Sequence, residues 1–101
     1  MPLNLEESNK ALESRFTELE YSPITAKIIR DSTKDSYEVI FASKDGVVRH
    51  LERGLTPKES LDLADGGTAY LKGKGYACIV DLTALPDEFK KDPLIRIKEA
   101  D

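Results

Sequence analysis

The side chains that most often carry out catalysis are scarce in this chain. His50 is its only histidine, so a pair of imidazoles cannot hold a metal ion, and within residues 48–51 it is typical of a half-buried or exposed strand residue. Cys78 is the only cysteine and lies in an apolar segment, where a buried thiol has a raised pKa and behaves as a small apolar side chain. We therefore expect neither residue to be catalytic.

After His50 and Cys78, three carboxylates are the strongest candidates for a site with chemical function. Asp62 and Asp65 are one turn apart in a predicted helix, and Asp81 ends the strand predicted to follow it. Such a trio could hold Mg²⁺ in a small metal-dependent hydrolase or nuclease. Solvated carboxylates are the ordinary case in a chain with 19 acidic residues, and the glycine-rich segments 66–68 and 72–75 match neither the P-loop nor the dinucleotide-binding motif. We expect no enzyme, no cofactor and no metal site, and keep the carboxylate trio as a third hypothesis.

The best-marked structural element is a helix over residues 57–73. Thr56 is a suitable N-cap, Pro57 suits the first helical position, and Glu59 completes a capping box with Thr56. Four residues recur at spacings of 3, 4 and 3, which places them on one helical face: Leu61, Ala64, Thr68 and Leu71. The segment Tyr76–Leu82 that follows is apolar on both faces, which predicts a central, buried strand.

Gly66 and Gly67 lie inside this predicted helix, although each glycine costs a helix interior about 1 kcal/mol relative to alanine. The alternative is a helix that ends near Asp65, followed by a hairpin of residues 68–71 and 76–82. We favour the single helix, because its apolar spacing continues through the glycines. The two glycines then expose bare backbone, which serves either close packing on the sheet or contact with a partner.

Alternating apolar residues predict three strands before this helix. They cover Ile24–Arg30, Ser36–Ser43 and the short Val47–Leu51, joined by polar and Asp-Gly turns, which predicts an antiparallel meander. An amphipathic helix is predicted over Asn4–Tyr21, before the meander. Near the other end of the chain, Leu94–Lys98 is either an edge strand or a tail.

These elements predict an α+β fold in the order α-β-β-β-α-β. The two helices should pack on a three- or four-stranded, mainly antiparallel sheet, in a single domain that spans residues 1–101 with flexible ends at 1–3 and 99–101. The second strand should bury Tyr37, Val39 and Phe41 against the central helix.

Two shape-level resemblances bear on function. The order helix, three strands, helix over residues 4–73 resembles that of double-stranded-RNA-binding domains, which implies RNA binding through lysines at the start of the second helix. Here that start, Thr56-Pro57-Lys58-Glu59, has a single lysine. The strand Tyr37–Phe41 and the helix opening Thr56–Leu61 are also similar to the small antitoxin domains of the hic type, although Lys44-Asp45-Gly46 replaces the Pro-Gly-Cys-like turn of that family.

The net charge of −4 and the absence of a basic block predict no appreciable binding of RNA or DNA at physiological salt. No apolar run approaches the roughly 20 residues of a membrane span, and the first residues do not resemble a signal peptide. The single cysteine excludes an internal disulfide. We expect a cytoplasmic protein without membrane contact.

The leading hypothesis is a small non-catalytic protein-binding module that acts as a regulator, inhibitor or accessory subunit of another protein, with a homodimer as a further option. RNA binding through a strip that includes Lys72 and Lys74 is the alternative. Two surfaces are candidates for the partner, the glycine patch and an open sheet edge. Their residues are Gly66, Gly67, Val47, Arg49 and Leu51.

Overall fold

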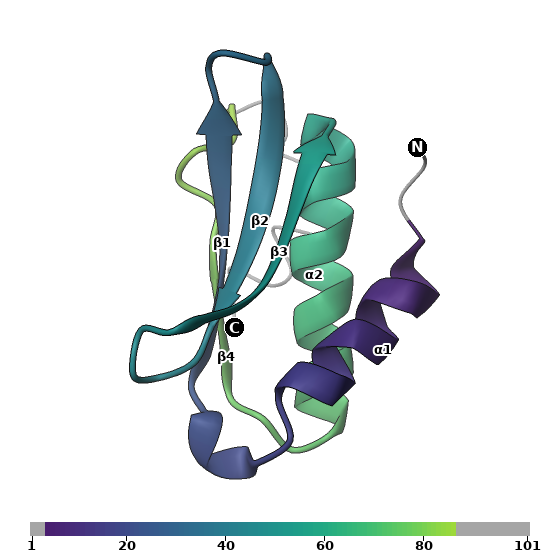
Figure 1. Cartoon of the computed structure of the whole chain (residues 1–101), viewed down its shortest axis with the longest axis vertical. Coiled ribbons are helices and arrows are strands. Elements are labelled where there is room, and N and C mark those ends of the chain that lie inside the picture. Colours follow the sequence, from purple (N-terminus) through teal and green to yellow (C-terminus); the bar gives the residue numbers. More distant parts are fainter. Residues whose placement is uncertain (1–3, 87–101) are drawn as a thin grey trace.

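The structure is a computed structural model that describes residues 4–86 (Figure 1). Its elements are α1 (Leu5–Arg15), the 3-10 turn η1 (Leu19–Tyr21), β1 (Ile24–Asp31), β2 (Ser36–Ala42), β3 (Val48–Leu55), α2 (Pro57–Gly73) and β4 (Cys78–Asp81). This order confirms the predicted α-β-β-β-α-β arrangement, an α+β fold with one mixed sheet of four strands. The predicted strand Leu94–Lys98 lies outside the described residues. Neither helix within residues 4–86 combines the length and apolar character that a membrane span requires.

α2 is one continuous helix of 17 residues through both glycines, so the alternative hairpin is wrong. The predicted capping box is present: the Glu59 backbone N–H donates to the Thr56 hydroxyl at 3.1 Å, and the Thr56 N–H donates to the Glu59 carboxylate at 2.9 Å. The buried face is rotated from the predicted one, since Leu63 is buried and Leu61 lies at the margin. Small residues on this face permit close approach to the sheet, which apolar spacing alone does not reveal. The buried set is Ser60, Leu63, Ala64, Gly67, Thr68 and Leu71.

The sheet has the strand order β3-β2-β1-β4. β1 pairs with β2, and β2 with β3, in the predicted antiparallel manner, whereas β4 runs parallel to β1. The expectation of a central strand over Tyr76–Leu82 is wrong, because β4 spans only Cys78–Asp81 and forms an edge of the sheet. α2 carries the chain across to the far side of β1, and the side chain of Ile79 in β4 remains exposed.

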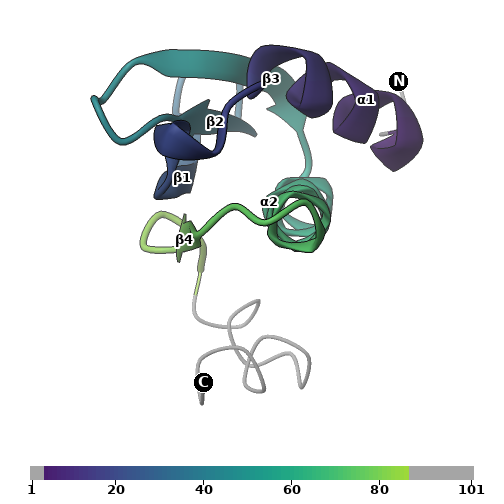
Figure 2. The same ribbon diagram turned by 90° about the horizontal axis from the view of Figure 1, so that it is seen from below.

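Both helices lie on one side of the sheet (Figure 2). The side chains of β1 and β2 that point toward them are buried, as predicted for the second strand: Ile24, Ala26, Ile28, Tyr37, Val39 and Phe41. They form one apolar core with Leu12, Phe16 and the buried face of α2. Within residues 4–86, no helix covers the opposite side of the sheet.

α1 ends earlier than predicted, at Arg15 instead of Tyr21. Phe16 leaves the helical conformation and is buried in the core. Its carbonyl accepts a hydrogen bond from the Tyr76 hydroxyl at 2.5 Å, whereas in a continued helix it would accept from the N–H of residue 20. A contact between residues 60 positions apart thus replaces a helical bond, and local spacing cannot predict it.

β3 is longer than the predicted Val47–Leu51 and continues to Leu55. Its pairing with β2 shifts register twice, and Gly54 has a positive φ of 69° at one of these shifts. Beside it, Arg53 forms an ion pair with Glu38 of β2, with Nε 3.5 Å from Oε2. The polar segment 52–54 therefore stays in the sheet through a bulge, where the hydrophobic alternation is lost.

Candidate protein-binding face of the sheet

The side of the sheet that faces away from the helices is a surface of its own, here called the open face. Because side chains alternate along a strand, the residues between the buried ones of β1 and β2 point to this side. Cross-strand pairing places two complete rows on it: Leu51, Ile40, Lys27 and Asp81 in the first, and Val48, Ala42, Thr25 and Ile79 in the second. A third row comprises Arg53, Glu38 and Ile29.

The open face carries most of the large apolar side chains that are exposed in residues 4–86. Val48 is 48% exposed, Leu51 38% and Ile79 53%, and Val47, in the turn that leads into β3, is 49% exposed. Ile40 is half-buried between them. Single exposed apolar residues are ordinary on a protein surface, but several of them on one uncovered sheet face are typical of a protein interface.

The charges in the three rows of the open face balance. Lys27 and Asp81 are register partners on β1 and β4, and Arg53 pairs with Glu38 across β3 and β2. Two basic and two acidic side chains therefore flank the apolar residues. A polyanion such as RNA requires an excess of basic side chains, so this face is better suited to a protein surface.

The predicted glycine patch is not part of the open face, because α2 lies on the opposite side of the sheet. A Cβ on Gly67 would stand 2.8 Å from Cζ of Phe41 and 3.0 Å from Cδ1 of Leu12, so close packing in the core accounts for this glycine. A Cβ on Gly66 would lie 3.4 Å from Cδ2 of Leu5, which is an ordinary contact. The structure therefore does not bring the two glycines together with the sheet-edge residues.

The three predicted edge residues have different surroundings. Leu51 lies on the open face, and Val47 lies in the adjoining turn. The Arg49 guanidinium instead stacks over the ring of Tyr21, 4.2 Å from its centre, and its Nε donates to the Ser43 hydroxyl at 3.0 Å. Arg49 thus ties β3 to η1 and to the β2–β3 turn, and Val47 and Leu51 remain the candidates for partner contact.

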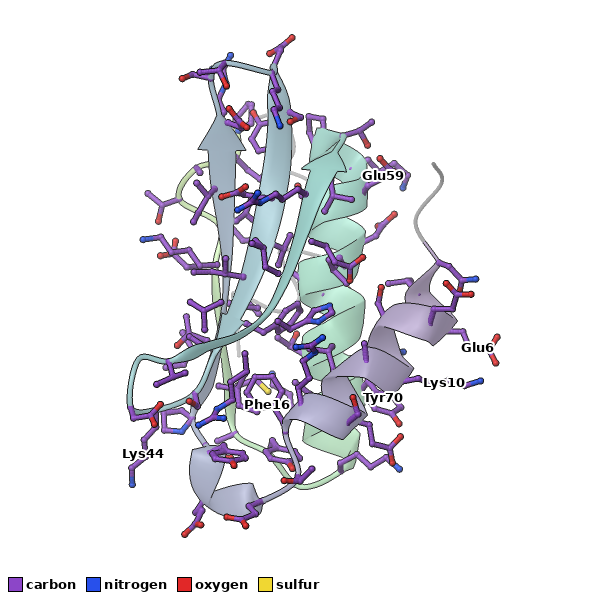
Figure 3. All side chains as sticks on the ribbon, viewed as in Figure 1. Glu6, Lys10, Phe16, Lys44, Glu59 and Tyr70 are labelled. Atoms are coloured by element: carbon purple, nitrogen blue, oxygen red, sulfur yellow. The ribbon has the colours of Figure 1, made fainter. Side chains whose placement is uncertain are left out.

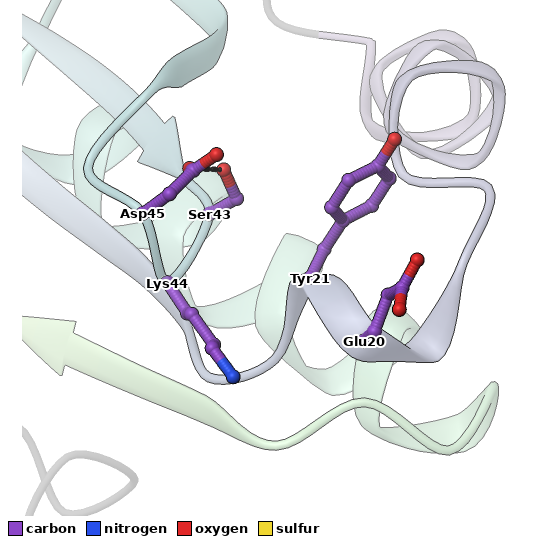
Figure 4. A pocket seen from close by; sticks show the side chains of 5 residues that line it. All are labelled: Glu20, Tyr21, Ser43, Lys44 and Asp45. Atoms are coloured by element: carbon purple, nitrogen blue, oxygen red, sulfur yellow. Dashed lines mark hydrogen bonds between the residues drawn. The ribbon is translucent and has the colours of Figure 1, made fainter.

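A cavity of about 290 Å³ lies beside this arginine (Figure 4), lined by Glu20, Tyr21, Ser43, Lys44 and Asp45. The Ser43 hydroxyl donates a hydrogen bond to Asp45, which lowers the pKa of that carboxyl. A carboxylate with a lowered pKa is a weak base, so Asp45 is poorly suited to activate Ser43 as a nucleophile. The pair instead stabilises the turn between β2 and β3.

The residues considered for chemistry are held in other contacts. His50 Nε2 lies 2.9 Å from Oε2 of Glu52, and the centre of the His50 ring lies 5.9 Å from the centre of the Phe41 ring. Cys78 is half-buried, and burial raises the pKa of its thiol. In the part of the chain that the structure describes, no three His, Cys, Asp or Glu side chains are grouped so as to hold a metal ion.

Lys74, one of the two lysines considered for RNA binding, faces α1. Its Nζ lies 3.4 Å from Oε1 of Glu13, and the attraction to this carboxylate raises the pKa of Lys74. The Tyr70 hydroxyl donates to the same carboxylate at 2.5 Å. These groups form a Glu13–Tyr70–Lys74 cluster between α1 and α2, in which an acid offsets the lysine charge.

Sequence reasoning did not include Ile40, Val48 and Ile79 in the candidate surface. A signal existed for Ile40, because it lies between two residues predicted to face the core and must point the other way. None existed for Ile79, since an apolar residue is equally typical of the central strand that was expected there. The chemistry and geometry of the open face make it a candidate binding surface. No protein-family model, curated protein or solved structure matches this chain.

Proposed function

We propose that this chain is a small, non-catalytic protein-binding module that docks another protein on the open face of its sheet, as a regulator, inhibitor or accessory subunit. The observation that carries the proposal is that three exposed apolar side chains, Val48 and Leu51 on β3 and Ile79 on β4, lie on a face without a covering helix in residues 4–86. The cytoplasm remains the compartment that the sequence leads us to expect.

These three side chains add apolar surface whose burial favours docking. Full burial of an aliphatic side chain is worth about 1.5–3 kcal/mol, so burial of the exposed part of each of these three residues is worth about 1 kcal/mol. The flanking charges, such as Lys27 and Asp81, contribute orientation and association rate more than affinity. The complementary partner has a flat apolar patch with both signs of charge at its rim.

Affinity capture from the source organism with three tagged forms of the chain tests this proposal. Leu51→Asp places a charge on β3, beside Ile40 of the open face. Leu5→Asp is the matched control, because Leu5 is also an exposed leucine, at 36%, but lies in the first turn of α1, where a carboxylate suits the helix dipole. Melting temperatures of the three forms establish that each is folded.

We expect the unsubstituted chain and Leu5→Asp to retain the same partner, and Leu51→Asp to retain roughly tenfold less of it or none. The physical reason is that a carboxylate at position 51 must lose its hydration when the face is covered. Equal capture by Leu51→Asp would place the partner elsewhere on the chain. Capture of no specific protein by any form would contradict the proposal itself.

A further inference from the structure

We propose that the half of the open face formed by β2 and β3 also binds a second copy of this chain, in a two-fold symmetric dimer. This inference rests on the proposed function, because it assigns an occupant to the same face when no other protein is bound there. The half consists of three cross-strand pairs: Arg53 with Glu38, Leu51 with Ile40, and Val48 with Ala42.

These pairs make the half complementary to itself. A two-fold axis that runs parallel to the strands, between β2 and β3, places β3 of one copy over β2 of the other. Leu51 then lies over the partner's Ile40, and Arg53 lies over the partner's Glu38. Because the axis repeats each contact, apolar side chains meet apolar ones twice and opposite charges meet twice.

Other symmetric arrangements of this sheet are poorer. An axis between β1 and β2 would cover all four strands, but it would place Leu51 over the partner's Asp81. Pairing edge to edge through β3 is hindered, because the Arg15 guanidinium donates to the Arg49 carbonyl at 3.4 Å. The two register shifts in β3 also distort this edge. The face-to-face arrangement about the β2–β3 axis is therefore the one that the residues favour.

The size of this contact limits its strength. Two strands about 4.8 Å apart, each about five residues long, give a strip of about 10 by 17 Å on each copy. This is well below the roughly 800 Å² that each partner buries in a standard stable complex. We therefore expect a dissociation constant of about 0.1–1 mM. Such a dimer forms at high concentration, and a partner that binds the same face more tightly displaces it.

Sedimentation equilibrium of the full chain, from about 10 µM to about 1 mM, tests the dimer through a charge exchange. Arg53→Glu makes the charged row acidic in both copies, and Glu38→Arg makes it basic in both copies. Each variant alone should have a dissociation constant roughly tenfold or more above that of the unsubstituted chain. An equimolar mixture of the two variants should dimerise again, because every contact across the axis then joins opposite charges.

The matched control is the pair Glu6→Lys and Lys10→Glu. These residues form an exposed ion pair on the outer surface of α1, with Lys10 Nζ 3.9 Å from Glu6 Oε1 (Figure 3). Neither control variant should change the dissociation constant. Leu51→Asp supplies a second check, since it should abolish the dimer without altering the charged row.

Loss of the dimer in each charge variant, with recovery in the mixture, supports the inference. A chain that stays monomeric at about 1 mM, or variants that dimerise as the unsubstituted chain does, would overturn it. If the chain is monomeric but still loses its captured protein on Leu51→Asp, the dimer is wrong and the proposed function stands. If the dimer forms but no other protein is captured, the proposed function is wrong and the dimer stands.

Discussion

Gly67 is the residue at which α2 comes closest to the sheet. A Cβ at this position would overlap the Phe41 ring and press against Leu12 of α1. At Gly66, one position earlier, a Cβ would meet only the side chain of Leu5 at an ordinary distance. The two adjacent glycines therefore have different roles. Gly67 is required by the close packing of the core, whereas Gly66 lowers helix stability and no close contact requires it.

Alanine substitutions at these two positions should act in opposite directions. Gly66→Ala should raise the free energy of unfolding by about 0.5–1 kcal/mol, because alanine favours the helix and its Cβ fits. Gly67→Ala should lower it by about 1–3 kcal/mol, because the core around Phe41 must shift to admit a Cβ. Urea unfolding of both variants measures the difference. If Gly67→Ala were as stable as Gly66→Ala, α2 would not approach the sheet as closely as described.

At the scale of elements, the Glu13–Tyr70–Lys74 cluster connects α1 to the second half of α2. The hydrogen bond from the Tyr70 hydroxyl, followed by the charge of Lys74, lowers the pKa of Glu13. The same contacts raise the pKa of Tyr70 and of Lys74. A carboxyl whose pKa is lowered by folding stabilises the folded state above its unfolded pKa, and this contribution is lost as the pH falls through the folded pKa.

Glu13→Gln should therefore reduce stability in a pH-dependent way. The three groups are exposed, so we expect the melting temperature to fall by only about 1–4 °C at about pH 7. The difference from the unsubstituted chain should vanish as the pH falls through the lowered pKa of Glu13, and it should shrink again as the pH rises through the raised pKa values of Tyr70 and Lys74. Glu6→Gln is the control for loss of a carboxylate that pairs within α1, since Glu6 contacts Lys10 of the same helix. A pH profile shared by both variants would show that the cluster does not join the helices.

The side chains on the two faces of the sheet contribute differently to stability. Phe41 of β2 is fully buried against α2, whereas Ile79 of β4 is half exposed on the open face. Phe41→Ala should lower the free energy of unfolding by about 3–5 kcal/mol, and Ile79→Ala should lower it by less than about 1 kcal/mol. Urea unfolding of the two variants checks this contrast. Similar losses for both would mean that the open face is covered in the folded chain.

The sequence predicted those elements whose boundaries depend on local interactions. α2 begins and ends as expected, because Thr56, Pro57 and Glu59 form its cap within one turn. The predicted end of α1 was wrong, because the observed end depends on the hydrogen bond that the Tyr76 hydroxyl donates to the Phe16 carbonyl. The prediction of a central strand over Tyr76–Leu82 was also wrong, because the position of β4 in the sheet depends on the path of the chain after α2.

At the scale of the whole molecule, two helices on one side of a four-stranded sheet leave the other side to the solvent in residues 4–86 (Figure 2). Leu51 and Val47 could be named from the sequence, because an exposed edge strand was expected there. Their association with Ile79 could not, because it requires the register of β1 with both β2 and β4. The candidate surface thus becomes visible only when the strand order is known.

Photo-crosslinking in the source organism can detect directly whether this open face contacts another protein. A photo-reactive amino acid in place of Leu51 should form a discrete adduct with a second, different protein, since position 51 is exposed on the open face. The same group in place of Leu5, which is exposed on α1, should form no such adduct. An adduct specific to position 51 is the result that we predict. No adduct at position 51, or the same adduct from both positions, would mean that the open face is not the binding surface.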